Sequence, residues 1–247
     1  MASFTFSADG VSIPVSDLPV SDVQQLRDRL EQGSSKQKFQ AIQELAAQGQ
    51  IGETVLMDVL RQRVEQPITA VEGAILQVLT RTSSADVQTL MAQHWGENGL
   101  IPLPSERNID YSPIQQALIH QEYEAADRLT LQKMCELAGP VAAGRKWLYF
   151  SDVDQFPVAD LQLLDRLWRV YSEDKFGFSI QRELWIKSNQ DWERLWPKIG
   201  WKGNNGWTRY PHEFTWDLSA PKGHLPLSNQ LRGVRVMASL MKHPAWN

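Results

Sequence analysis

The residues whose chemistry stands out lie in an aromatic-rich stretch near the carboxyl end of the chain. From about residue 198 to 227 the sequence is rich in glycine, asparagine and proline, and its aromatic side chains recur without helical spacing. They are Trp201, Trp207, Tyr210, Phe214 and Trp216. Two hypotheses fit this pattern. The rings either wrap the domain as an irregular core or form a binding surface for a large apolar ligand.

A helix predicted over residues 227–242 adds positive charge beside these rings. Its apolar residues repeat at helical spacing, and its basic residues follow the same spacing one position later, so Arg232 and Arg235 lie one turn apart on a basic face. A solvated helix face gives the same pattern. Paired guanidinium groups also suit carboxylates. An aromatic cup beside them would fit a flat apolar acid, and a tetrapyrrole has that shape.

The sequence contains no pattern typical of a common enzyme. It has no glycine-rich phosphate loop with its lysine, no dinucleotide fingerprint, no HExxH and no CxxC. The five histidines are scattered without metal-ligand spacing. Asp152 and Asp154 fall in a predicted loop, where turn and capping roles are commoner than acid–base catalysis. We therefore predict a non-catalytic protein with no intrinsic cofactor and no metal site.

Composition and charge restrict the protein class further. A net charge of −4 and a pI near 5.8 argue against a protein that binds nucleic acid by neutralising many phosphates. Cys135 is the single cysteine, which fits a reducing compartment. No segment has the apolar length of a transmembrane helix, and the first thirty residues do not resemble a signal peptide. The expected location is the cytosol.

Hydrophobic spacing predicts an all-α protein in two parts. Residues 1–95 show short helical stripes joined by tight turns, as in an antiparallel bundle or stacked helix pairs of the HEAT kind. Residues 96–110 contain two glycines and two prolines among polar residues and are predicted to be a linker. Residues 111–247 form the second domain. Nine of the ten tryptophans lie after residue 146, so the two parts differ in construction.

Several runs in the second part closely resemble the genomes-uncoupled family of porphyrin-binding proteins, accessory factors of magnesium chelatase in oxygenic phototrophs. The runs are CELAGP (135–140), WLYF (147–150), FGFS (176–179), LWPKIGW (195–201), FTWDLSAP (214–221), GHLPL (223–227) and QLRGVRV (230–236). The resemblance spans about residues 98–247, and the first part is similar to the additional helical domain of the cyanobacterial members.

This resemblance implies an all-helical core whose two long loops bind protoporphyrin IX and Mg-protoporphyrin IX. It also implies stimulation of magnesium chelatase in chlorophyll biosynthesis, with the large porphyrin-binding subunit as partner, in a cytosolic protein able to associate peripherally with membranes. Related proteins carry tryptophan where Tyr210 stands. The residues implied to line the site are Phe150, Phe156, Ile199, Trp207, Tyr210, Phe214 and Leu225, with Arg232 and Arg235 meeting the propionates. The alternative is a helical scaffold whose aromatic surface docks a partner protein without porphyrin.

Overall fold

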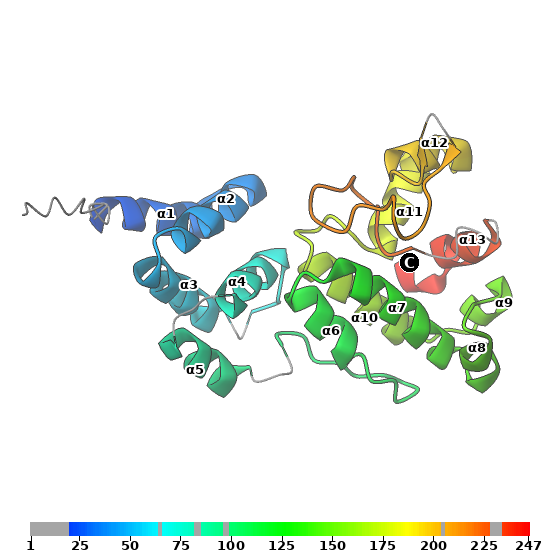
Figure 1. The fold of residues 1–247 in the computed structure, drawn as a ribbon, viewed down its shortest axis with the longest axis horizontal. Helices are drawn as coiled ribbons and strands as arrows, with labels where there is room; N and C mark the ends of the chain where they lie inside the picture. Colours follow the sequence, from blue (N-terminus) through cyan, green and yellow to red (C-terminus); the bar gives the residue numbers. More distant parts are fainter. Residues whose placement is uncertain (1–19, 64–65, 82–84, 96–98, 204–205, 228–233) are drawn as a thin grey trace, which may run out of the picture.

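The computed structural model describes residues 20–63, 66–81, 85–95, 99–203, 206–227 and 234–247. These residues are mostly helical, which confirms the all-α prediction (Figure 1). The first part holds α1 (Val20–Gln32), α2 (Ser35–Ala46), α3 (Gln50–Gln62), α4 (Ala70–Thr80) and α5 (Ala85–His94). The second holds α6 (Ser112–Ile119), α7 (Tyr123–Leu137), α8 (Pro140–Arg145), α9 (Phe150–Val153), α10 (Val158–Val170), α11 (Phe178–Lys187), α12 (Trp192–Lys198), β1 (Lys202–Gly203), β2 (Gly206–Trp207), α13 (Arg235–Lys242) and the 3-10 helix η3 (Pro244–Trp246).

The first five helices pack successively through the apolar stripes that the sequence shows. Leu26 and Leu30 of α1 are buried against α2, and Leu56 and Leu60 of α3 are buried in the same core. Helix α4 begins with a capping box. The Thr69 hydroxyl accepts from the Val71 amide at 3.3 Å, and Glu72 accepts from the Thr69 amide at 2.8 Å. These local signals explain why this part is helical.

Helix α4 connects the first part of the chain, α1 to α5, to the second part. It contacts α10 and α6, and Gly73 lies so close to α10 that an added Cβ would stand 2.1 Å from the Val170 carbonyl oxygen. The buried Gln77 side chain donates to the carbonyls of Leu118 at 2.8 Å and Tyr171 at 2.9 Å. Buried apolar residues of both parts therefore belong to one continuous core.

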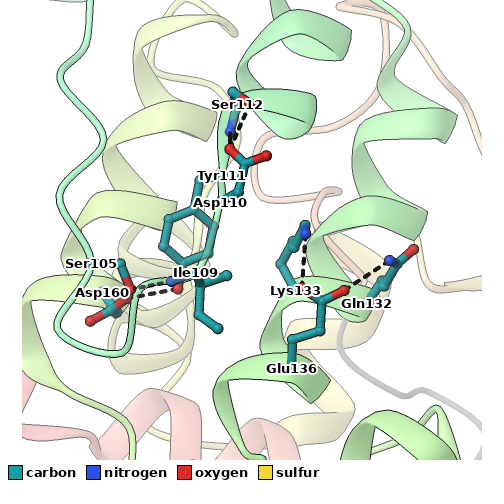
Figure 2. A network of polar contacts seen from close by, with 9 residues as sticks. All are labelled: Ser105, Ile109, Asp110, Tyr111, Ser112, Gln132, Lys133, Glu136 and Asp160. Carbon is teal, nitrogen blue, oxygen red and sulfur yellow. Dashed lines mark hydrogen bonds and ion pairs between the residues drawn. The ribbon is translucent and has the colours of Figure 1, made fainter.

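The predicted linker, residues 96–110, has no helix among its described residues but is fixed to the core. Figure 2 shows Asp160 of α10 beside Ser105 and Tyr111. The Ser105 and Tyr111 hydroxyls donate to Asp160 Oδ1 at 2.5 and 2.9 Å, and the Glu106 amide donates to its Oδ2 at 3.0 Å. Leu100 is also buried. The segment from 99 to 111 thus packs against the second part of the chain.

The centre of the second part is formed by α6, α7 and α10. The Trp168 indole of α10 is fully buried and donates to Thr130 of α7 at 3.0 Å. The stretch after α7, which includes the predicted loop around Asp152 and Asp154, contains the short helices α8 and α9. The last helix, predicted from about residue 227, is described as α13 from Arg235, and residues 228–233 of that prediction lie outside the described residues. Before them, the Leu227 amide donates to Asp127 of α7 at 2.6 Å.

Candidate functional site

The segment between α12 and α13 is organised around a buried histidine. His224 Nδ1 lies 2.7 Å from the Ile199 carbonyl, and its Nε2 accepts from the Thr215 amide at 3.3 Å. These partners assign the proton to Nδ1. Burial lowers the pKa of His224, which keeps the ring neutral. Its carbonyl accepts from the Trp201 indole at 2.7 Å. His224 therefore serves the fold of this segment.

Most of the tryptophans in this region stack against one another. Ring centroids are 5.1 Å apart for Trp185 and Trp192, 5.2 Å for Trp192 and Trp196, and 5.6 Å for Trp196 and Trp201. Trp207 of β2 packs on the outside of this stack, 5.6 Å from Trp196, and remains 47% exposed. The tryptophans of this stack therefore form an irregular aromatic core with one exposed ring.

A cavity of about 600 Å³ opens between α7, α8 and the aromatic-rich stretch of residues 198–227, which we call the aromatic segment. Its volume falls within the range of small-molecule sites. The wall combines equal numbers of apolar or aromatic residues and of charged or amide residues, so it can take a ligand that has both apolar surface and charged groups. The lining residues are Asp127, Arg128, Leu131, Gln132, Cys135, Glu136, Ala143, Lys146, Tyr210 and Leu227.

Helix α7 supplies one wall of this cavity from a single face. Asp127, Leu131 and Cys135 are spaced by four residues and so project to the same side of the helix. Burial raises the pKa of the Cys135 thiol to about 11, so the sulfur stays protonated and unreactive at neutral pH. Together, the three residues give the wall a carboxyl group at one end and apolar surface along the rest.

Asp127 connects this wall to the aromatic segment. Its side chain is 3% exposed and accepts from the Leu227 amide at 2.6 Å, and the Tyr210 side chain lies close enough to lower its pKa. Burial raises the pKa of Asp127 to about 7, against the opposing effect of these two groups. Both partners of the carboxyl group, Tyr210 and Leu227, line the cavity.

Charged groups lie around the cavity mouth. Arg128 is exposed and forms an ion pair with Glu124 at 3.5 Å, and Lys146, at the end of α8, is also exposed. Glu136 is paired with Lys133 at 2.8 Å, and this pair together with Gln132 is drawn in Figure 2. Arg128 and Lys146 can therefore offer positive charge to a ligand whose carboxylates project from the cavity.

A second hollow of about 400 Å³ lies between α9 and α13. It brings together Phe150, which is 42% exposed, and Arg235, whose Cζ lies 5.9 Å from the Phe150 ring centroid. Lys242 and Asp154 also line it. This hollow places Arg235, predicted to meet a propionate, beside Phe150, predicted to line the porphyrin site.

The residues predicted for the site are thus distributed over four environments. Tyr210 lines the larger cavity, Phe150 and Arg235 line the second hollow, and Trp207 lies on the outer surface. The side chains of Phe156, Ile199, Phe214 and Leu225 are buried in the hydrophobic core. Arg232 lies outside the described residues.

Sequence reasoning did not single out the cavity residues on α7 and α8. The available signal was Asp127, because a carboxylate on the apolar face of a helix needs a partner when it is buried. That partner is reached only through tertiary structure, since Leu227 lies 100 positions further along the chain.

The described residues contain no cluster of three or more histidine, cysteine, aspartate or glutamate side chains arranged to hold a metal ion. Within the same residues, every helix is too short or too polar to cross a membrane.

Two family descriptions match this chain. Residues 104–244 match a family described as GUN4-like, and residues 15–96 match an ARM-like repeat domain described as GUN4-N terminal. The chain belongs to the GUN4 family. Its first five helices correspond to the ARM-like repeat domain of that family, and its later helices correspond to the GUN4 core.

Curated relatives extend over most of the chain. A Ycf53-like protein of Synechocystis sp. is 48% identical over 225 residues, covering 90% of this chain and 96% of the relative. An Arabidopsis thaliana protein named "Tetrapyrrole-binding protein, chloroplastic" is 32% identical over 145 residues, covering 55% of each chain.

Solved structures resemble the GUN4 core of this chain. GUN4 from Chlamydomonas reinhardtii has a TM-score of 0.56 at 37% identity, covering 59% of this chain and 93% of its own. Ligand-free GUN4 from Arabidopsis thaliana has a TM-score of 0.52 at 34% identity, covering 56% of this chain and 97% of its own.

Proposed function

We propose that this protein is a non-catalytic tetrapyrrole carrier that binds protoporphyrin IX and Mg-protoporphyrin IX in the cavity between α7, α8 and the aromatic segment. The observation that carries the proposal is the cavity of about 600 Å³, lined by both apolar and charged residues, in a chain of the GUN4 family. The name of the Arabidopsis relative gives the class of ligand.

The cavity's composition suits a porphyrin in a particular orientation. Leu131, Ala143 and the Tyr210 ring offer apolar surface to the macrocycle, whose burial supplies most of the binding free energy. Asp127 and Glu136 would repel its propionates, whereas Arg128 and Lys146 at the mouth would attract them. The ligand therefore enters with its carboxylates directed toward Arg128 and Lys146.

The role of the bound pigment is delivery to a chelatase. We propose that the protein stimulates magnesium chelatase in chlorophyll biosynthesis by presenting porphyrin to the large subunit, and that it works in the cytosol with peripheral association to membranes. A carrier of this kind lowers the porphyrin concentration that the chelatase requires. The matching assay measures magnesium insertion at limiting porphyrin with and without this chain.

Titration of the purified protein with deuteroporphyrin tests the binding itself. Bound porphyrin should quench the fluorescence of the tryptophans with saturation. Leu131→Glu should weaken binding at least tenfold, because it places a carboxylate in the apolar wall beside an anionic ligand. Leu129→Glu is the matched control, since Leu129 is a partly buried leucine of α7 that does not line the cavity.

Saturable quenching by the wild type, lost in Leu131→Glu and kept in Leu129→Glu, supports the proposed site. Absence of quenching above a solvent control in the wild type would rule out tetrapyrrole binding. Equal affinities in the two variants would place the ligand elsewhere.

Partner docking is a second candidate function, and one observation favours it. Val141 of α8 is 77% exposed, and Phe150 of α9 is 42% exposed beside the basic residue Arg235, so both helices present apolar side chains to solvent. Val141→Glu should then reduce chelatase stimulation while porphyrin affinity stays unchanged. Leu131→Glu should instead weaken porphyrin affinity and leave chelatase stimulation unchanged.

A further inference from the structure

The carboxyl group of Asp127 has an environment that the fold alone does not require. It belongs to α7, yet it meets two separate points of the aromatic segment: it accepts from the Leu227 amide at 2.6 Å, and it lies close enough to the Tyr210 hydroxyl for each group to shift the pKa of the other. Burying a carboxyl group is costly, and the raised pKa of Asp127 shows that this cost is only partly offset by its hydrogen bonds. A group kept at such a cost beside a cavity is a candidate for a functional role.

The two partners of Asp127 are cavity walls. The Tyr210 ring makes edge contacts with Phe214 and Trp216, each with centroids 5.8 Å apart, and these contacts orient the plane of the ring. These contacts do not fix the distance between the ring and α7, which depends on a partner for the Tyr210 hydroxyl group. The nearby carboxyl group of Asp127 offers that hydroxyl a polar partner, and the 2.6 Å bond from Leu227 fixes the other end of the segment at the same carboxyl group.

We propose that Asp127 is a positioning residue for tetrapyrrole binding, which holds the Tyr210 ring and Leu227 against α7 so that the cavity keeps a shape complementary to a flat macrocycle. The inference rests on the proposed function. Asp127 acts through the aromatic segment, because the groups that its carboxyl group meets there are the Leu227 amide and the Tyr210 hydroxyl. The face of the Tyr210 ring stays available for stacking on the ligand.

Charge is not what this role requires. Asp127 lies near Glu124 and Arg128 on its own helix, and the group that faces it from the aromatic segment is Tyr210. An asparagine has a side-chain oxygen with two lone pairs, so it can accept from both the Tyr210 hydroxyl and the Leu227 amide. Asp127→Asn should therefore preserve the cavity, and Asp127→Ala should not.

The test is deuteroporphyrin titration of the full chain in four variants, each with its unfolding midpoint in urea. Asp127→Ala should bind about tenfold more weakly than wild type, a change of about 1.4 kcal/mol. Asp127→Asn should stay within about threefold of wild type, and Tyr210→Phe, which keeps the ring and removes the hydroxyl, should lose about three- to tenfold.

Asp165→Ala is the matched control for lost stability. Asp165 is another buried carboxyl group, and it accepts from the Ser179 amide at 2.8 Å and from the Ser179 hydroxyl at 2.7 Å, but it does not line the larger cavity. This variant should unfold at lower urea and bind deuteroporphyrin like wild type. A purely structural role for Asp127 predicts the same behaviour for Asp127→Ala.

Wild-type affinity in Asp127→Ala or in Tyr210→Phe overturns the inference, and so does an Asp127→Asn variant as weak as Asp127→Ala. If Asp127→Ala does not fold, Tyr210→Phe decides alone. Failure of the wild type to bind deuteroporphyrin would instead refute the proposed function, so the two failures are distinguishable.

Discussion

Replacing Gly73 by alanine should destabilise this protein, although alanine ordinarily stabilises a helix. A glycine-to-alanine change inside a helix gains roughly 0.5–1 kcal/mol when the new methyl group has space. At Gly73 the new Cβ would stand 2.1 Å from the Val170 carbonyl oxygen and 2.8 Å from a Val170 side-chain carbon. Neither α4 nor the backbone of α10 can give way without disturbing the other.

The size of the effect follows from these opposing contributions. Overpacking of a core costs about 1–3 kcal/mol, which outweighs the helix-forming gain and leaves a net loss of roughly 1–2 kcal/mol. In a protein of this size that corresponds to a fall in Tm of about 2–8 °C. Gly144 of α8 is the control, since an added Cβ there meets no atom within 4 Å. Gly144→Ala should be neutral or slightly stabilising.

Urea and thermal unfolding of the full chain would measure both variants. Gly73→Ala should unfold earlier than wild type and keep its affinity for deuteroporphyrin, because no residue of α4 lines the larger cavity. A Gly73→Ala variant as stable as wild type, or more stable, would show that α4 does not pack on Val170. The role of α4 in joining the two parts would then be wrong.

The remaining predictions concern the linker segment, pH and truncation. Asp160→Ala should cost about 3–4 kcal/mol of unfolding free energy in urea, since the hydrogen bonds from Ser105, Glu106 and Tyr111 lose their acceptor, and a loss below 1 kcal/mol would contradict this. The pKa of Asp127 is raised to about 7, so between about pH 4 and 7 the folded chain holds a proton that the unfolded chain has released. Relative to Asp127→Asn, the wild type should therefore lose stability as pH rises through this window, and a constant difference between the two urea midpoints would refute the shift. A chain beginning at Gly96 should still fold and bind deuteroporphyrin but unfold at lower urea, because the contacts of Gly73 and Gln77 are removed. Loss of binding in a folded truncation would assign the first five helices a part in the site.

Helical periodicity was sufficient to predict the class of this fold. Apolar residues at helical spacing mark the short helices of residues 1–95, and the sequence signal for the end of α7 is Gly139 followed by Pro140. The short helices α8 and α9 were not predicted, because six and four residues are too few to show a period. The predicted start of the last helix near residue 227 adjoins residues 228–233, which lie outside the described residues, and the bond between Leu227 and Asp127 joins positions that only tertiary structure brings together.

The candidate site could be predicted only in part. Sequence composition directs attention to the aromatic segment, and Tyr210 does line the larger cavity. Periodicity carries no information about which rings of an irregular segment turn inward, so the burial of Phe214 and of Trp201 becomes evident only in the fold. The opposite wall, formed by Leu131 and its neighbours on α7, looks like an ordinary helix face in the sequence.

A crystal structure of the full chain with bound deuteroporphyrin would test most directly that the cavity between α7, α8 and the aromatic segment is the tetrapyrrole site. We expect the macrocycle to lie between Leu131 and the Tyr210 ring, with its carboxylates directed toward Arg128 and Lys146. Porphyrin found instead in the hollow between Phe150 and Arg235, or stacked on the exposed Trp207, with the larger cavity unoccupied, would contradict that claim.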